Sequence, residues 1–316
     1  MPDNSDDTTK PLNYSQIPIV TYTLAILCVL VSLANWTTSL SPIFQRISVL
    51  TTFSNEQIWD GAFYGLFTAF FAHGNFAHLV FNILFVVLLG RTIEPVMPRA
   101  VYLLFMILAA GITAGCELGI VGLTAIGASG VGCAMFGLMW AGQARFESWR
   151  TIATNQNMGL VLIGLLLCVV VSALKIVPVA NIAHFSGILF GVCMGKLWAA
   201  PKQRPFFLAV LLLLALVPTI CLFWMPWSPK RTHYLANKAY DAKDYERAIS
   251  LYHKSLRLGG KRFRNWDAIK NAWAHIAANA AARGDLKAEN EAIANMVYAA
   301  RQEGESPYIK DAKTTP

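Results

Sequence analysis

Charged residues are scarce in this chain. Asp, Glu, Lys and Arg make up 14% of its 316 residues, whereas 55% are hydrophobic. An average soluble domain contains about 25% charged residues, so this composition excludes an ordinary soluble protein and predicts a membrane protein with several spans. The net charge of +8 does not indicate a nucleic-acid partner, because the basic residues are divided between short loops and a charged C-terminal segment.

Cysteine pairs and metal-binding motifs are also missing. The six cysteines lie in or beside hydrophobic stretches, and the polar C-terminal segment has none. This pattern predicts neither a disulfide framework nor a metal cluster. His73 and His78 are five residues apart with no glutamate between them, unlike the His-Glu-x-x-His pair of a zinc peptidase. We therefore expect no metal and no cofactor.

Two other classes of membrane protein lack their signatures here. The hydrophobic stretches contain no pair of central aspartates, which an intramembrane aspartyl protease would need. They also show no matching interrupted segments in the two halves of the chain, which are typical of inverted-repeat transporters. The chain opens without a basic region or a small-residue cleavage site, so we expect no cleavable signal peptide.

The hydrophobic residues gather in seven stretches. A helix needs roughly 20 apolar residues to cross a bilayer, and each stretch approaches that length. They are residues 17–37, 76–92, 98–120, 129–145, 158–177, 182–199 and 206–227. The aromatic connection 38–75 is predicted to lie in the membrane surface. The expected fold class is all-α, a polytopic membrane helix bundle with a small helical C-terminal domain.

This pattern divides the chain into five segments. We expect a disordered N-terminal tail at 1–16, a membrane core at 17–200, a seventh membrane helix at 201–229, a helical domain at 230–305 and a disordered tail at 306–316. Alanine and aromatic residues in the helical domain predict two hairpins that resemble tetratricopeptide repeats, which would bind a protein partner. The alternative is two hairpins that simply pack together.

The basic residues of the membrane core occupy alternate loops. They are Arg91, Arg99, Arg145, Arg150, Lys196, Lys202 and Arg204. The positive-inside rule places these loops and the N-terminus in the cytoplasm, and an odd number of spans then places the C-terminus outside. This pattern fits an integral protein of a bacterial inner membrane, and an organellar membrane remains an alternative.

Polar side chains from three different spans are predicted to meet near the outer face. Ser129 opens the fourth span, His184 lies near the start of the sixth, and His73 precedes the second. Polar residues inside a membrane are costly and usually mark function. A serine becomes a nucleophile when a histidine takes its proton. Because no Asp or Glu lies deep in any span, we expect a Ser129–His184 dyad without an acid.

The residues around this dyad suggest how an oxyanion could be stabilised. Gly127 and Gly130 flank Ser129 and leave the backbone N–H groups of the turn open to a substrate. Asn82 and His73 are the candidate side-chain donors to the same oxyanion.

Three motifs in this order resemble the rhomboid intramembrane serine proteases. They are HGNFAHLVFN at 73–82, GASG at 127–130 and AHFSG at 183–187, the last followed by Gly191 and Gly195. The resemblance covers the six-helix core, about residues 17–200. It implies a serine endopeptidase that cleaves transmembrane or juxtamembrane segments of other membrane proteins, with the lipid bilayer as its surroundings.

The resemblance also assigns roles to individual residues. Ser129 would attack the peptide bond, and His184 would act as general base and acid. Asn82, His73 and the N–H of Ser129 would form the oxyanion hole. The residues with an implied structural role near the site are His78, Gly127, Gly130, Gly187 and Glu94.

The chain departs from the family pattern at two places. The Trp-Arg pair that the family often carries before its first histidine is replaced by Tyr64 and Gly65, and an aromatic that often stacks on the catalytic histidine is replaced by Cys133. The main alternative is an inactive rhomboid-like protein that only binds membrane proteins. Such a protein would be expected to lack the serine or the histidine, and both are present.

Overall fold

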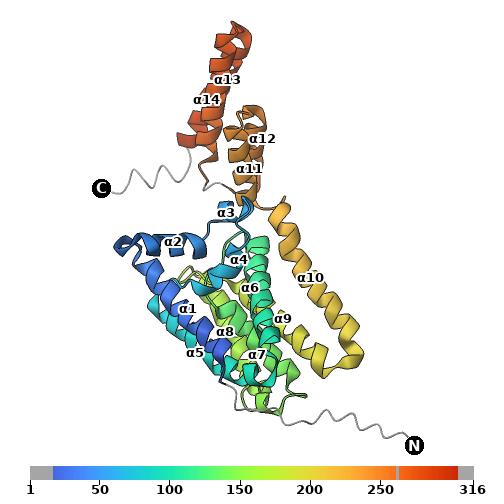
Figure 1. The fold of residues 1–316 in the computed structure, drawn as a ribbon. Coiled ribbons are helices and arrows are strands. Elements are labelled where there is room, and N and C mark those ends of the chain that lie inside the picture. The colour runs from blue at the N-terminus through green and yellow to red at the C-terminus, as the bar shows by residue number, and fades with distance from the viewer. Residues whose placement is uncertain (1–16, 261–262, 305–316) are drawn as a thin grey trace, which may run out of the picture. The chain divides into compact units, whose positions relative to one another are not determined.

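The computed structural model describes residues 17–260 and 263–304. The two tails expected to be disordered, 1–16 and 306–316, lie outside the described residues. The described part of the chain is helical throughout and contains no strand. The chain divides into two compact units, Met1–Phe223 and Trp224–Pro316 (Figure 1). The prediction of an all-helical membrane bundle is confirmed.

Six helices of the first unit are long and apolar enough to cross a membrane. They are α1 (Ile19–Trp36), α5 (Phe76–Ile93), α6 (Arg99–Val121), α8 (Asn155–Ala173), α9 (Asn181–Ala199) and α10 (Arg204–Phe223). The stretch predicted as a further span at 129–145 forms a shorter apolar helix, α7 (Ser129–Gly142). Its 14 residues fall short of the roughly 20 that a full span requires. The protein is therefore an integral, multi-pass membrane protein.

The connection between α1 and α5 is built of short helices. They are η1 (Thr38–Leu40), α2 (Pro42–Thr51), α3 (Asn55–Trp59), α4 (Gly65–Thr68) and η2 (Ala69–Phe71). Tyr64 packs edge-on against Phe53, with ring centroids 5.1 Å apart. A Cβ on Gly65 would collide with the same Phe53 ring. Tyr64 and Gly65 thus anchor this connection through an aromatic contact.

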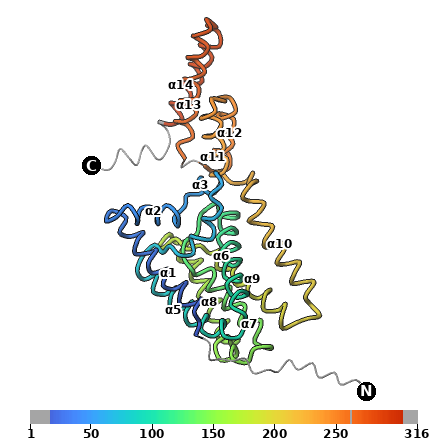
Figure 2. The backbone as a smooth tube through the Cα atoms, viewed as in Figure 1, coloured from blue at the N-terminus to red at the C-terminus, as the bar shows by residue number. Residues whose placement is uncertain are grey.

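Helices α7 and α9 pack in backbone contact inside the first unit (Figure 2). Three glycines of α9 at four-residue steps face α7. A Cβ on Gly187 would collide with the carbonyl oxygen of Gly130, and one on Gly191 with that of Ala134. A Cβ on Gly195 would lie 2.6 Å from the carbonyl oxygen of Leu138. Because lipid provides no hydrophobic force between helices, this close packing is the main attraction that holds the pair together.

Helix α10 packs against α6 and α9. Pro218 lies inside α10 and fits against Gly115 of α6, where a Cβ would collide with it. Proline has no N–H, so it leaves the carbonyl of Leu214 without its usual helical donor. The thiol of Cys116 points at that carbonyl, with Sγ 3.9 Å from the oxygen. Pro218 of α10 is therefore matched by a glycine and a thiol donor on α6.

The second unit consists of α11 (Pro229–Asp241), α12 (Tyr245–Arg257), α13 (Asn265–Ala282) and α14 (Leu286–Gly304). They form two hairpins that meet along α12 and α13. Buried Asn265 joins the hairpins, since its amide donates to the Gly260 carbonyl at 2.7 Å and its Oδ1 lies 2.8 Å from Nδ1 of His233. Two helical hairpins are present here as expected, while their likeness to tetratricopeptide repeats stays a prediction.

The glycine contacts between α7 and α9 predict a position-specific loss of stability. Gly191→Ala should lower the thermal stability of the detergent-solubilised protein, because overpacking of this kind costs about 1–3 kcal/mol. Gly164→Ala on α8 is the matched control, since a Cβ there meets nothing within 4 Å. Equal midpoints for the two variants in thermal unfolding would contradict the proposed role of the contact.

Candidate active site

Ser129 and His184 lie at the starts of two neighbouring helices. Ser129 is the first residue of α7, and His184 is the fourth residue of α9. The Nε2 atom of His184 lies 2.7 Å from the Oγ atom of Ser129, which is hydrogen-bonding distance. The two helices also touch close to the dyad, at Gly130 of α7 and Gly187 of α9. The structure thus brings together the two residues that the sequence singled out as a dyad.

His184 has no acidic partner in the described residues. It is 8% exposed, and its Nδ1 atom has no hydrogen-bond partner within the described ranges. None of the aromatic rings described in this structure stacks on it, in keeping with Cys133 at the position expected to carry one. The orientation of the imidazole therefore depends on how the first turn of α9 is held.

The turn before α7 requires glycine. Gly127 has φ +100°, a conformation that strains any residue with a Cβ. A Cβ there would also lie 2.8 Å from Cε1 of His78 and 3.4 Å from Nδ2 of Asn82. The N–H of Gly127 donates to the carbonyl of Ala69 at 2.9 Å. His78 and Asn82 of α5 therefore lie directly against the turn that carries Ser129.

Asn82 offers an unused donor at this place. It is 2% exposed, and within the described residues its Nδ2 atom has no hydrogen-bond partner. A buried amide N–H without an acceptor is costly, and in native structures it calls for an explanation such as a bound ligand or water. An amide beside Ser129 can donate to an oxygen of a molecule bound there.

His73 occupies a different environment. It is 2% exposed, its Nδ1 atom lies 3.1 Å from the hydroxyl of Ser32, and its Nε2 atom accepts the N–H of Ala128 at 3.4 Å. The indole N–H of Trp36 donates to its carbonyl at 2.8 Å. Both ring nitrogens are thus engaged in contacts that tie α1 to the turn before Ser129.

These positions differ from the roles expected for the two histidines. The sequence motif predicts that His73 acts with Asn82 and that His78 braces the connection before α5. In the structure His78 lies beside Asn82, and His73 makes the bracing contacts. The spacing of these residues in the sequence indicates the same arrangement, because residues four positions apart lie on one face of a helix. His78 and Asn82 have that spacing, and His73 precedes the helix.

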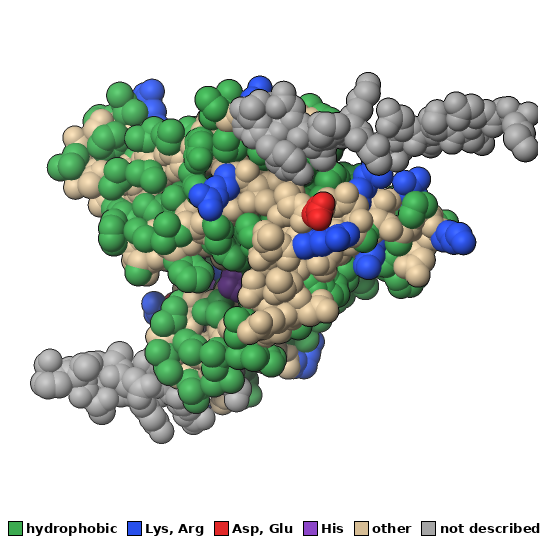
Figure 3. Space-filling view, turned by 90° about the horizontal axis from the view of Figure 1, so that it is seen from below, with side chains coloured by type: hydrophobic (Ala, Val, Ile, Leu, Met, Phe, Trp, Pro, Cys, Tyr) green, Lys and Arg blue, Asp and Glu red, His purple; other side chains and the backbone are tan. Residues whose placement is uncertain are grey.

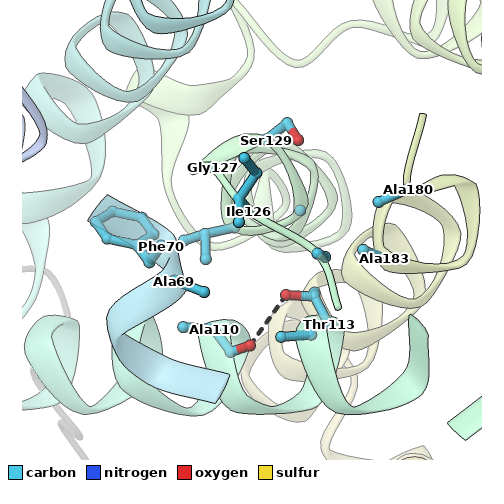
Figure 4. A pocket seen from close by; sticks show the side chains of 13 residues that line it. Ala69, Phe70, Ala110, Thr113, Ile126, Gly127, Ser129, Ala180 and Ala183 are labelled. Carbon is cyan, nitrogen blue, oxygen red and sulfur yellow. Dashed lines mark hydrogen bonds between the residues drawn. The ribbon is translucent and has the colours of Figure 1, made fainter. Parts of the chain in front are cut away.

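A small pocket lies beside Ser129 (Figure 4). Its lining consists mostly of alanine and glycine, and Figure 4 shows Thr113 across the pocket from Ser129 and Gly127. The Thr113 hydroxyl donates to carbonyls of its own helix, those of Ala109 at 2.8 Å and Ala110 at 3.2 Å. The pocket is therefore narrow and presents little polar chemistry of its own.

Glu94 is a buried residue that is distant in sequence from Ser129 and His184. Its carboxylate binds the N-terminus of α1. It is 2% exposed, and its carboxylate accepts the N–H groups of Val20 at 3.0 Å and Thr21 at 2.8 Å. Arg99 lies 3.7 Å from the same carboxylate.

Across the described ranges, His, Cys, Asp and Glu side chains form no group of three that could hold a metal ion.

Comparison with known proteins assigns a family to part of the chain. No curated protein matches the chain. Residues 60–201 match the family model of the rhomboid domain. That range contains the dyad, both histidines before it and Asn82, and it ends just after α9. The chain therefore contains a rhomboid domain, and over residues 60–201 it is similar to the rhomboid family.

Proposed function

We propose that this protein is an intramembrane serine endopeptidase that uses Ser129 and His184 as its catalytic dyad. The single observation that supports this most strongly is the 2.7 Å contact between Ser129 Oγ and His184 Nε2 within a rhomboid domain. A serine and a histidine in this contact, on separate helices of an apolar unit, form the minimum nucleophile and base for acyl transfer.

The reaction follows from the chemistry of the pair. His184 Nε2 takes the proton of Ser129 Oγ as the oxygen attacks the carbonyl carbon of the scissile peptide bond. The same nitrogen then gives that proton to the leaving amine, and the C–N bond breaks to leave an acyl-serine. A water molecule, deprotonated by His184, attacks the ester, and the Ser129 hydroxyl forms again as the acid product leaves.

The oxyanion of the intermediate needs donors beside Ser129. The amide of Asn82 is unpartnered within the described residues and lies against the turn that carries the serine. The ring of His78 touches the same turn, whereas both ring nitrogens of His73 are engaged elsewhere. We therefore assign the oxyanion hole to Asn82, His78 and the N–H of Ser129, with His73 as a structural residue.

Substrates of such a site are transmembrane or juxtamembrane segments of other membrane proteins. The alanine and glycine lining of the pocket fits a small side chain next to the scissile bond. Helix α8 has only Met158 and Leu165 buried among its residues, so it packs loosely against the unit and is the proposed side of lateral access. A substrate helix must unwind locally, because a hydrogen-bonded helix presents no free carbonyl.

The charge pattern supports an orientation in the membrane. Figure 3 views the molecule from the end where α5, α7 and α9 finish, and Lys and Arg side chains spread over the visible face. Exposed basic residues at or just beyond the ends of these helices include Arg91, Arg145 and Lys202. The positive-inside rule places them in the cytoplasm and the dyad toward the outer side of a bacterial plasma membrane.

Cleavage in a defined bilayer tests the proposal. Purified protein in liposomes should cut a model single-span substrate, and Ser129→Ala and His184→Ala should each lower kcat by at least ~10³-fold, because the two residues act as one unit. Ser186→Ala is the matched control. Ser186 is a buried serine of α9, and its hydroxyl donates to the Ala183 carbonyl instead of contacting the dyad.

A native protein that binds the substrate helix and leaves it uncut would contradict the protease function. It would favour the alternative, a catalytically inactive rhomboid-like binder of membrane proteins.

The two histidines of the first motif should have separable roles. His78→Ala should lower kcat by about 10²-fold with little change in thermal stability, because it removes an oxyanion donor. His73→Ala should lower the thermal midpoint, because it removes the contacts to Ser32 and Ala128. Measurement of kcat and of the thermal midpoint for both variants decides the assignment. The reverse pattern would identify His73, instead of His78, as the oxyanion donor.

The second unit is proposed to bind a protein partner or an extramembrane part of a substrate. All residues of the proposed site lie in the first unit. A protein truncated after Ser228 should therefore cleave the model substrate with kcat/KM within about 3-fold of the full chain, since that substrate has no segment for the second unit to bind. A much larger loss in the same liposome assay would indicate a folding role instead.

A further inference from the structure

Helix α9 begins without a cap of its own. The residue before its first turn is Ala180, which has no side-chain acceptor, and no side chain at that position caps the helix. The first N–H groups of any helix lack partners within the helix. Inside a membrane unit they must be satisfied by protein groups, because little water reaches them.

Glu117 of α6 provides the missing acceptor. Its side chain is 3% exposed, and its Oε2 atom accepts the N–H of Ala183 at 3.0 Å. The carboxylate also accepts the N–H of Ile182. These are the second and third N–H groups of α9, the ones that an N-cap side chain normally binds. The carboxylate also lies at the positive end of the helix dipole.

The capped turn leads directly into His184. The imidazole follows Ala183 in the chain, and within the described residues its Nδ1 atom has no partner. In a serine triad an acid bonded to that nitrogen holds the ring in place. Here the position of the ring depends on the side chains packed around it and on the backbone that carries it, and Glu117 fixes that backbone from a neighbouring helix.

We propose that Glu117 is a positioning residue for His184. It caps α9 from α6, fixes the axial position of the first turn, and thereby keeps Nε2 within hydrogen-bonding distance of Ser129. This inference rests on the proposed protease function. It assigns a positioning role to a buried carboxylate. No hydrogen bond described in the structure joins this carboxylate to Ser129 or to the imidazole of His184.

The structure contains a natural control for this role. Helix α1 is preceded by Pro18 and also lacks a side-chain cap. Glu94 accepts the N–H groups of its second and third residues, Val20 and Thr21. A buried glutamate therefore caps the N-terminus of another helix at two places in the membrane unit. Of the two capped turns, the one in α9 carries a residue of the dyad.

Substitutions that change the reach of the two carboxylates test the proposal. Glu117→Gln keeps an acceptor oxygen at the same distance, whereas Glu117→Asn is one methylene too short. In the liposome assay E117N should lower kcat by about 10²-fold, the effect of a small misplacement of a catalytic group. E117Q should lose less than about 10-fold, and KM should stay within about 3-fold in both. E94N should lower the thermal midpoint but not the kcat of the folded protein.

A second substitution separates positioning from general stability. Ala180→Ser places an N-cap acceptor on α9 itself, so A180S in the E117N background should recover about 10-fold of the lost kcat. If E117N does not fold, Glu117→Asp has the same short reach and takes its place. Unchanged kcat in the short variant, no recovery with A180S, or an equal loss of kcat in E94N would each overturn the proposal.

Two measurements do not depend on cleavage. Hydrogen exchange at the amides of Ile182 and Ala183 should be faster in E117N than in E117Q, and the NMR signals of a labelled His184 ring should shift only in the short variant. If the native protein cuts nothing, the protease function fails, and these measurements still decide whether Glu117 positions the ring. Equal exchange and an unshifted ring signal would contradict it.

Discussion

The contact between the backbones of α7 and α9 is the constraint on which the rest of the membrane unit depends. At Gly187 and Gly191 the helices are so close that no side chain fits between them. Since Ser129 and His184 lie in the first turns of these two helices, the same approach sets the distance between Oγ and Nε2. The stability of the α7–α9 pair and the geometry of the dyad therefore depend on the same contact. A substitution that separates the two helices affects both.

A second theme is the matching of polar groups across helices. Glu94 and Glu117 bind helix N-termini that have no caps of their own, and Cys116 points at a carbonyl that a proline leaves unpaired. Each of these groups would be costly in a bilayer without its partner. These three polar side chains thus lie where the backbone of another helix lacks a donor or an acceptor.

Much of the fold could be predicted from local sequence patterns. Hydrophobic length located the long membrane helices, and the motifs around Ser129 and His184 indicated which two spans would meet. The stretch 129–145 was predicted as a full span from its apolar run, but α7 ends at Gly142, before the polar residues Gln143 and Arg145. The hairpins of the second unit followed from helical periodicity, which does not decide whether they act as a binding repeat.

The parts that could not be predicted depend on contacts between distant segments. Glu117 did not stand out, because its partner is a backbone N–H 66 residues away, and every residue except proline carries one. The positions of His73 and His78 depended on which of them lies on the helix face that meets Gly127. Their spacing to Asn82 contained that information, but a motif compared only by its residue types does not reveal it.

The shortness of α7 has a consequence for where a bond can be cut. Fourteen residues extend about 21 Å at 1.5 Å per residue, against a hydrocarbon core of about 30 Å. If the distal end of α7 lies at one boundary of that core, Ser129 lies about 9 Å inside the other. That depth equals about six residues of helix. In the proposed protease, the cleaved bond would lie below the edge of the substrate's span, and its new ends would have to travel that distance to reach water.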